Sequence, residues 1–211
     1  MTFYLFFKRI LDVLVALALI LIFLPIWLII PILILFDSGW PVFFKHKRTG
    51  LHGVQFSLYK FRSMVKDADD ILHQKNSLLL NKFKKNDWKI KASEDPRVTH
   101  LGRVLRSLTI DEFPQLFNVI KGEMSMVGPR AYLKEELLEQ MKRYPDTRKY
   151  LRLILSVKPG ITGIWQVNGR NEIPFIKRAQ MDASYAKKTN QNIFFDLKIL
   201  FQTPGAMINK W

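Results

Sequence analysis

The longest uninterrupted apolar run lies near the start of the chain. It extends from Val13 to Phe36 without a charged residue, which exceeds the roughly 20 residues that a transmembrane helix needs. Pro25 lies near its middle, where a proline removes a helical hydrogen bond and bends or breaks the helix. Basic residues flank both ends of the run, and this favours keeping both ends on the cytoplasmic side. We therefore expect a re-entrant helix-break-helix over residues 1–38, in preference to a spanning helix, and a second domain over residues 39–211.

The N-terminal edge of this apolar run carries charge. Lys8, Arg9 and Asp12 occur within the sequence KRILD. Residues three or four apart lie on the same face of a helix. This spacing predicts that Asp12 forms a local ion pair at the membrane interface, and nothing in it favours a catalytic role.

Alternating apolar and polar positions follow the apolar run. Segments 42–46 and 54–60 have the alternation of β-strands, and the connection 47–53 contains two glycines, so a hairpin is expected. Lys60 and Arg62 lie at the exit of the second strand. The hairpin is either a structural platform or places one of these basic side chains over a phosphate.

Most other apolar positions recur with helical spacing. Thr99 is expected to cap a short helix whose apolar face includes Leu101 and Leu105. The other expected elements are a helix over 65–80, a charged loop over 82–95, a helix from about Asp111 to a stop at Gly122, a turn over 124–130, helices over 131–144, 147–157 and 173–188, and an interfacial amphipathic helix over 192–211 with Trp211 as a headgroup anchor. The predicted fold is mainly α with a small β-hairpin.

Composition adds a strong positive charge to this apolar chain. Of the 211 residues, 48% are hydrophobic, and 33 Lys plus Arg against 18 Asp plus Glu give a formal net charge of +15. This combination is typical of a protein on an anionic membrane surface that handles anionic ligands, and nucleic-acid binding is the competing use of such charge. Cysteine is absent, which excludes disulfides, thiolate metal sites and a cysteine nucleophile. Oxygen ligands would have to hold any metal, which indicates Mg²⁺ or Mn²⁺.

Two adjacent carboxylates, Asp111 and Glu112, are the main candidates for chemistry. If Asp111 is at a helix cap, Pro114 falls within the first turn, where its missing N–H is tolerated. Acidic residues at a helix start commonly cap orphan N–H groups. The alternative is a metal-assisted site for an anion, which the neighbouring Arg106 and Arg130 favour. Arg130 is either exposed or directed at the acidic pair.

A glycine-rich stretch, KPGITGIWQVNGRN, occupies residues 158–171. It is either a nucleotide or sugar cradle or a tight structural turn, and it does not match the P-loop or dinucleotide-binding fingerprints. Its candidate binding residues are Gly160, Thr162, Gly163, Gln166, Asn168 and Arg170.

In this order along the chain, the motifs resemble the bacterial sugar transferases, the small monotopic phosphoglycosyl transferases. The resemblance implies a re-entrant membrane helix and a membrane-associated catalytic domain on the cytoplasmic face of the bacterial inner membrane. The matching residues are Lys8-Arg9 with Asp12, Pro25, Tyr59 to Met64, Asp95-Pro96-Arg97 through Arg106, Asp111-Glu112, Gln115 to Asn118, Gly128-Pro129-Arg130, and Pro159 to Gly163 through Arg170.

The resemblance also implies a reaction. A sugar-1-phosphate would move from a nucleotide diphosphate sugar, expected to be a UDP-sugar, to polyprenyl (undecaprenyl) phosphate, with release of UMP, as the first membrane step of exopolysaccharide, O-antigen or capsule assembly. Asp111 would be the nucleophile that forms a covalent aspartyl-phosphosugar, with Glu112 as its partner and both as Mg²⁺ ligands. Arg62, Arg106 and Arg130 would bind substrate phosphates. No nucleic-acid partner is expected, and a homodimer stays open.

The chain departs from the commoner family pattern at positions outside the acidic pair. The departures are Leu24 where serine is common, His46 where glutamine is frequent, Glu123 where aspartate is usual, and Ala131 where a second proline commonly occurs.

The rival hypothesis is a non-enzymatic, membrane-anchored basic module that binds anionic lipid or nucleic acid, and such a module needs no adjacent carboxylates.

Overall fold

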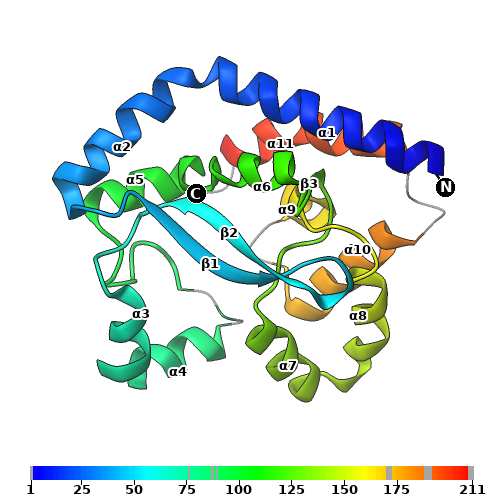
Figure 1. Cartoon of the computed structure of the whole chain (residues 1–211). Coiled ribbons are helices and arrows are strands. Elements are labelled where there is room, and N and C mark those ends of the chain that lie inside the picture. The colour runs from blue at the N-terminus through cyan, green and yellow to red at the C-terminus, as the bar shows by residue number, and fades with distance from the viewer. Residues whose placement is uncertain are drawn as a thin grey trace. The chain divides into compact units, whose positions relative to one another are not determined.

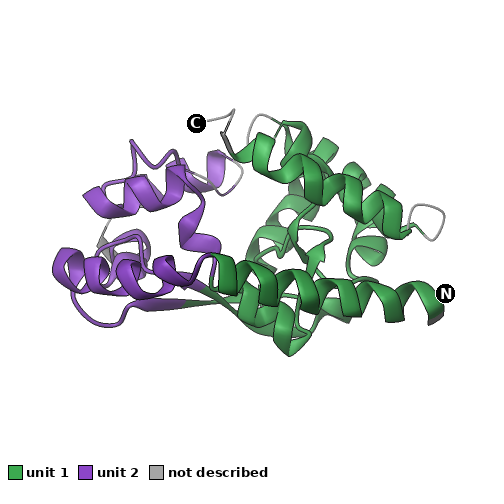
Figure 2. Ribbon diagram, turned by 90° about the horizontal axis from the view of Figure 1, so that it is seen from above, with its two compact units in different colours: residues 1–22, 45–59, 114–211 green, residues 23–44, 60–113 purple. Residues whose placement is uncertain are grey.

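The computed structural model of the chain describes residues 2–75, 77–86, 88, 90–169, 173–187 and 192–208. These residues form two compact units (Figure 2). Unit 1 comprises residues 1–22, 45–59 and 114–211, and unit 2 comprises residues 23–44 and 60–113. This division concerns packing alone and does not test the expected boundary between residues 38 and 39.

The apolar run forms two helices, α1 (Thr2–Ile22) and α2 (Leu24–Ser38). They are bent by 65° at the break between them. Pro25 lies in the first turn of α2, where a missing N–H costs little, so the break expected there is confirmed. No single helix of the described residues is long and apolar enough to cross a membrane, whereas this bent pair together has the necessary length and composition. The re-entrant path through a bilayer stays a prediction.

The structure contains two small sheets (Figure 1). Strands β1 (Phe43–Thr49) and β2 (Gln55–Phe61) pair in the first, which confirms the hairpin. In the second, β3 (Ser125–Val127) pairs in parallel with β4 (Gly160–Thr162). The turn predicted over 124–130 was wrong for its first residues, and neither interpretation of 158–171 included a strand, because strands of three residues are too short to produce a readable alternation.

Among the described residues, six helices follow within unit 1 after residue 114. Figure 1 shows α11 running beside α1, although the two are almost at opposite ends of the chain. Gly122, with φ of 82°, ends α6 as expected. The helices are α6 (Gln115–Lys121), α7 (Lys134–Arg143), α8 (Arg148–Ile154), α9 (Ile164–Asn168), α10 (Phe175–Ala186) and α11 (Ile193–Ile208). Unit 1 also contains short 3₁₀ turns at Leu51–Gly53 and Pro145–Thr147.

The apolar core of unit 2 packs around α2 and the end of β2. It is formed by Ile30, Ile34, Val42, Phe61 and Leu105. The remaining elements of this unit are α3 (Ala68–Asp70), a π-helical turn (Ile71–Lys75), α4 (Ser77–Lys85), α5 (His100–Ser107) and a 3₁₀ turn (Ile110–Glu112).

Helix α5 approaches the chain that leaves β2 very closely. The Gly102 N–H donates to Thr99 Oγ1 at 2.8 Å, which confirms Thr99 as the cap. A Cβ atom on Gly102 would lie 1.9 Å from the Ser63 carbonyl oxygen. Only glycine therefore allows this contact, which brings α5 against the segment that follows β2.

Three expectations about local structure need correction. The helix expected over 65–80 is divided into α3, a π-helical turn and the start of α4, and α4 includes the first residues of the expected loop 82–95. Asp111 lies in a 3₁₀ turn, and the next helix begins only at Gln115. Asp12 does not pair locally: its carboxylate accepts hydrogen bonds from Ser125 and Met126. The anchor Trp211 lies outside the described residues.

Candidate active site

Asp111 is held in a sharply turned and buried piece of backbone. Thr109, just before it, adopts a left-handed conformation with φ of 59°, which is uncommon for a residue with a branched side chain. The 3₁₀ turn that follows leaves Asp111 only 5% exposed. By contrast, 33% of the Glu112 side chain remains exposed. The two carboxylates therefore differ in solvation although they are adjacent.

Lys60, the penultimate residue of β2, bridges the two carboxylates. Its Nζ lies 2.7 Å from Glu112 Oε1 and 3.3 Å from Asp111 Oδ2. The sequence left open whether Lys60 contacts a phosphate, and in the structure it holds the acidic pair. It is the sole hydrogen-bond donor to Asp111 among the residues that the structure describes.

The surroundings of Asp111 disfavour its ionised form. Burial raises the pKa of the Asp111 carboxyl above its usual range, and the charge of Glu112 raises it further. Lys60 and Arg106 act in the opposite direction and lower this pKa. A buried carboxylate whose pKa is raised by burial and by a neighbouring negative charge, and lowered by neighbouring positive charges, is typical of a functional group.

Arg106, from α5, contributes a buried positive charge to this region. Its Nε donates to Ser63 Oγ at 2.9 Å. Burial lowers its pKa, and the negative charges of Asp111 and Asp95 raise it. The structure thus brings Arg106 into the electrostatic environment of Asp111, as the sequence suggested.

Arg62 lies two residues beyond Lys60 and is directed elsewhere. Its Nη2 donates to the carbonyl oxygens of Ser38 and Gly39, at the C-terminal end of α2. A cation at this position satisfies orphan carbonyls and complements the helix dipole. In the structure Arg62 therefore holds the end of α2, and its contact with a substrate phosphate stays a prediction.

The acidic pair has a donor set that suits a divalent cation only when other ligands are present. Mg²⁺ is usually bound through one or two carboxylates, water and substrate phosphates. Within the described ranges, no group of three or more His, Cys, Asp or Glu side chains could hold a metal. Asp111 and Glu112 already direct oxygens at one cation, the Lys60 ammonium. The two carboxylates would fit a divalent cation whose remaining ligands were water and phosphate oxygens.

Arg130 belongs to unit 1, where it follows β3. The backbone N–H of Arg130 donates to Asp182 Oδ2 at 3.4 Å. The Arg130 guanidinium lies 5.9 Å from the centre of the Trp165 ring. Tyr132 and Trp165 also donate to Asp182, at 2.8 and 3.2 Å. The contact between Arg130 and a substrate phosphate, which the family resemblance implied, stays a prediction.

The glycine-rich stretch packs tightly against the segment that leads to Arg130. A Cβ atom on Gly160 would lie 2.0 Å from the Gly128 nitrogen, and one on Gly163 would lie 2.4 Å from the Gly128 oxygen. Both glycines are therefore needed for close backbone packing, but this packing joins β4 to β3 and is not the tight turn that was one of the two interpretations of the stretch. A contact between this glycine-rich stretch and a substrate stays a prediction.

The polar candidates of this stretch have different surroundings. Thr162 Oγ1 lies 2.9 Å from Thr203 Oγ1, and the Asn168 amide donates to the Ile164 carbonyl. Gln166 Oε1 is buried and accepts no hydrogen bond from the described residues. Arg170 lies outside the described residues.

Sequence reasoning did not single out the buried carboxylates Asp182 and Asp196 of unit 1. Asp182 accepts from three donors in two segments, the loop that contains Arg130 and Tyr132 and helix α9, and nothing in its local pattern distinguishes it. Asp196, 1% exposed, pairs with Lys8 at 2.8 Å. A lone carboxylate within the apolar segment FFDLKILF was the available signal, because a buried charge needs a partner.

Comparison with known proteins places these features in a family. The sequence profile described as "Bacterial sugar transferase" matches residues 3–210. The chain is 39% identical over 202 residues to the exopolysaccharide production protein ExoY of Rhizobium meliloti, covering 95% of this chain and 84% of that protein. It is 38% identical over 207 residues to the undecaprenyl-phosphate galactose phosphotransferase of Salmonella typhimurium.

The coverage of these relatives differs. The Salmonella alignment covers 97% of this chain but 41% of that protein. An undecaprenyl-phosphate glucose phosphotransferase of Komagataeibacter xylinus is 35% identical over 207 residues, which cover 93% of this chain and 35% of that protein. Because the profile matches almost the whole of it, the chain belongs to the bacterial sugar transferase family.

Proposed function

We propose that this protein transfers a sugar-1-phosphate from a nucleotide diphosphate sugar, a UDP-sugar, to undecaprenyl phosphate as the first membrane step of glycoconjugate assembly. The observation that carries the proposal is the buried Asp111 carboxylate, held by Lys60 beside Glu112 and Arg106. Two relatives are named as undecaprenyl-phosphate galactose and glucose phosphotransferases, which supports this acceptor lipid and this class of reaction.

Two displacements at one phosphorus account for the transfer. In the first, an oxygen of Asp111 attacks the phosphorus next to the sugar, the bond from that phosphorus to the bridging oxygen breaks, and UMP leaves with the electron pair. In the second, an oxygen of the polyprenyl phosphate attacks the same phosphorus and releases Asp111. The products are the polyprenyl diphosphate sugar and UMP, and ping-pong kinetics follow.

The basic residues reduce the repulsion between the attacking carboxylate and the diphosphate. Lys60 orients both carboxylates and favours the ionised form of Asp111. Arg106 adds a fixed positive charge nearby, and such preorganised charge is most effective in a buried site. Arg62 and Arg130 are proposed to bind phosphate oxygens, for which a planar guanidinium is well suited.

Mg²⁺ or Mn²⁺ is the proposed cofactor, held by Glu112 and Asp111. When bound, the ion would act as a Lewis acid that stabilises charge on the transferring and departing phosphate oxygens. Displacement of Lys60 from between the carboxylates would then leave its ammonium free to contact a phosphate.

The proposed location is the cytoplasmic face of the bacterial inner membrane. Helices α1 and α2 expose many large apolar side chains, among them Phe6, Leu14, Leu28 and Phe36. A 65° bend between two apolar helices suits an element that enters and leaves the same leaflet. The net charge of +15 suits an anionic lipid surface and two anionic substrates.

The direct test is a search for the covalent intermediate. The purified protein is incubated with UDP-sugar and Mg²⁺ without the acceptor lipid, and peptides are examined by mass spectrometry. A phosphosugar on the peptide that contains Asp111, together with UMP, is expected. Asp111→Asn should give neither, whereas the matched control Asp70→Asn, an exposed carboxylate in the same unit, should behave like the parent.

Two results would contradict the proposal. An active parent protein with no adduct at Asp111 under trapping conditions would exclude the covalent route. Absence of UMP release with a panel of nucleotide sugars, together with lipid binding that survives loss of both carboxylates, would favour the rival basic binding module.

A further inference from the structure

Strand β3 has a strand neighbour on only one of its edges among the described residues. Its register with β4 pairs Ser125 with Gly160 and Val127 with Thr162, and all three residues of β3 are buried. Buried main-chain N–H and C=O groups need hydrogen-bond partners. The polar groups of β3 that do not pair with β4 therefore need partners outside the sheet.

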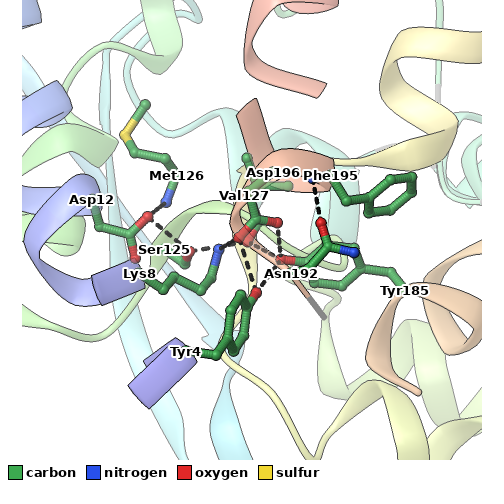
Figure 3. Close-up of polar contacts among 10 residues, drawn as sticks. All are labelled: Tyr4, Lys8, Asp12, Ser125, Met126, Val127, Tyr185, Asn192, Phe195 and Asp196. Atoms are coloured by element: carbon green, nitrogen blue, oxygen red, sulfur yellow. Dashed lines mark hydrogen bonds and ion pairs between the residues drawn. The ribbon is translucent and has the colours of Figure 1, made fainter. Parts of the chain in front are cut away.

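Asp12, from the middle of α1, supplies one of these partners. Its Oδ1 accepts from the Met126 N–H at 2.9 Å and from Ser125 Oγ at 3.0 Å (Figure 3). Asp12 is 4% exposed. Its carboxylate therefore acts on β3 as the main chain of a further strand would.

Tyr185 and Asp196 connect α1 to β3 by a second route. The Tyr185 hydroxyl lies 3.0 Å from the Val127 carbonyl oxygen and 2.7 Å from Asp196 Oδ1. On its other side Asp196 Oδ2 accepts from Lys8 at 2.8 Å and from Tyr4 at 2.9 Å. Figure 3 shows these groups as one continuous network around β3.

The backbone carries this constraint onward from β3 to Arg130. The Gly128 N–H donates to the Thr162 carbonyl at 2.9 Å, and the Gly160 N–H donates to the Pro129 carbonyl at 2.8 Å. The Gly128 and Gly160 backbones are in direct contact, with no room for a side chain. Because the Gly128 and Gly160 backbones are packed without space between them, a shift of β3 is expected to change the position of Arg130.

We propose that Asp12 is a positioning residue for Arg130 in the transfer reaction. It fixes the unpaired edge of β3, so that α1, the helix expected to enter the membrane, determines where the Arg130 guanidinium lies. Asp12 itself touches neither the substrate nor the reacting atoms. This inference rests on the proposed function, because it assumes that Arg130 binds a substrate phosphate.

A double-mutant cycle on UMP release tests the inference. The variants are Asp12→Ala, Arg130→Ala and the double variant, with Asp12→Asn as the conservative change that keeps an accepting oxygen. A misplacement of about 1 Å can cost on the order of 10²-fold in rate. We expect Asp12→Ala to lower kcat/KM for the UDP-sugar by about 10- to 100-fold and Asp12→Asn to recover most of it.

The decisive comparison is made in the Arg130→Ala background. If Asp12 acts through Arg130, the effects are strongly non-additive, and Asp12→Ala should cost less than about 2-fold there. Hydrogen exchange should show faster exchange over residues 125–130 in Asp12→Ala and unchanged exchange over residues 100–112. If Asp12→Ala does not fold, Ser125→Ala, which removes one of the two hydrogen bonds between Asp12 and β3, provides the cycle in both backgrounds.

Two results overturn the inference in distinguishable ways. An equal fold loss from Asp12→Ala in both backgrounds means that Asp12 stabilises the fold without positioning Arg130, while the proposed function still stands. A wild-type protein that releases no nucleoside monophosphate from any donor means that the proposed function is wrong, and the inference is lost with it.

Discussion

Two regions of this molecule contain buried carboxylates that differ in the number of hydrogen bonds that their oxygens accept. In unit 1, Asp12 accepts two hydrogen bonds, and Asp196 accepts three, including one from the Lys8 ammonium. In unit 2, Asp111 is as deeply buried but accepts a single hydrogen bond from the described residues, at 3.3 Å from Lys60.

This difference separates a structural carboxylate from a reactive one. An oxygen that accepts several short hydrogen bonds is stabilised as an anion and has little remaining capacity to attack phosphorus. Burying a charge with few partners costs free energy, and Asp111, with a single hydrogen bond from the described residues, retains unused lone pairs. Such under-satisfied buried groups are typical of functional sites.

The comparison between structural and reactive carboxylates is tested most strongly by removing one charge at a time. Asp111→Asn should reduce UMP release by roughly 10³-fold or more, as loss of a covalent nucleophile generally does. Its thermal stability should be unchanged or higher, because a poorly satisfied buried charge has been removed. Steady-state assays and thermal melts in detergent measure both properties, and substantial residual turnover would contradict the nucleophile assignment.

Asp196→Asn should show the opposite behaviour. It leaves the Lys8 ammonium, 12% exposed, without its counter-ion, and breaking a buried pair costs about 3 kcal/mol or more. Stability measured in denaturant should fall accordingly, and the double variant Lys8→Met with Asp196→Asn should recover part of the loss. A fully stable Asp196→Asn would show that the pair contributes little.

The pH dependence of kcat/KM in Lys60→Met tests the same comparison at Asp111. Asp111 must be ionised to attack, so activity is lost as the pH falls through its pKa. Since Lys60 lowers that pKa, its removal should shift the acid limb of the kcat/KM profile to higher pH. The rate near neutral pH should fall about 10-fold or more, the lower range for losing an electrostatic contact. An unmoved acid limb would mean that Lys60 does not tune Asp111.

A pH-dependent effect on stability is expected at Asp182, which is buried between Tyr132, Trp165 and Arg130. Burial raises its pKa from 3.8 to about 7. The folded state therefore binds a proton that the unfolded state has released, and stability should decline as the pH rises from about 4 to about 7. Asp182→Asn should flatten this decline in melting temperature. An unchanged slope would show that another group is responsible.

The sequence identified features whose physical cause is local. The break at Pro25, the cap at Thr99 and the stop at Gly122 follow from backbone chemistry within one helical turn, and the structure confirms all three. The acidic pair was recognisable by its setting, with Arg106 before it and Arg130 after it among motifs that resemble the family, because adjacent carboxylates also occur elsewhere in the chain.

Other features depend on contacts between distant residues. Asp12 was expected to pair with Lys8 or Arg9, four and three positions away, yet its partners lie more than a hundred positions along the chain. Lys8 pairs with Asp196 and Arg9 with the Val119 and Ile120 carbonyls. Local spacing shows which charges are within reach, but packing decides which of them meet.

The sequence by itself determined the apolar helices, their break, the hairpin and the family motifs, because propensity, capping and periodicity act over a few residues. Only the tertiary structure decided that Lys60 bridges the two carboxylates, that Arg62 holds the end of α2, and that two three-residue strands pair in parallel. These outcomes depend on which polar groups are left without water when distant segments pack, and a buried group then takes the nearest partner that the fold provides.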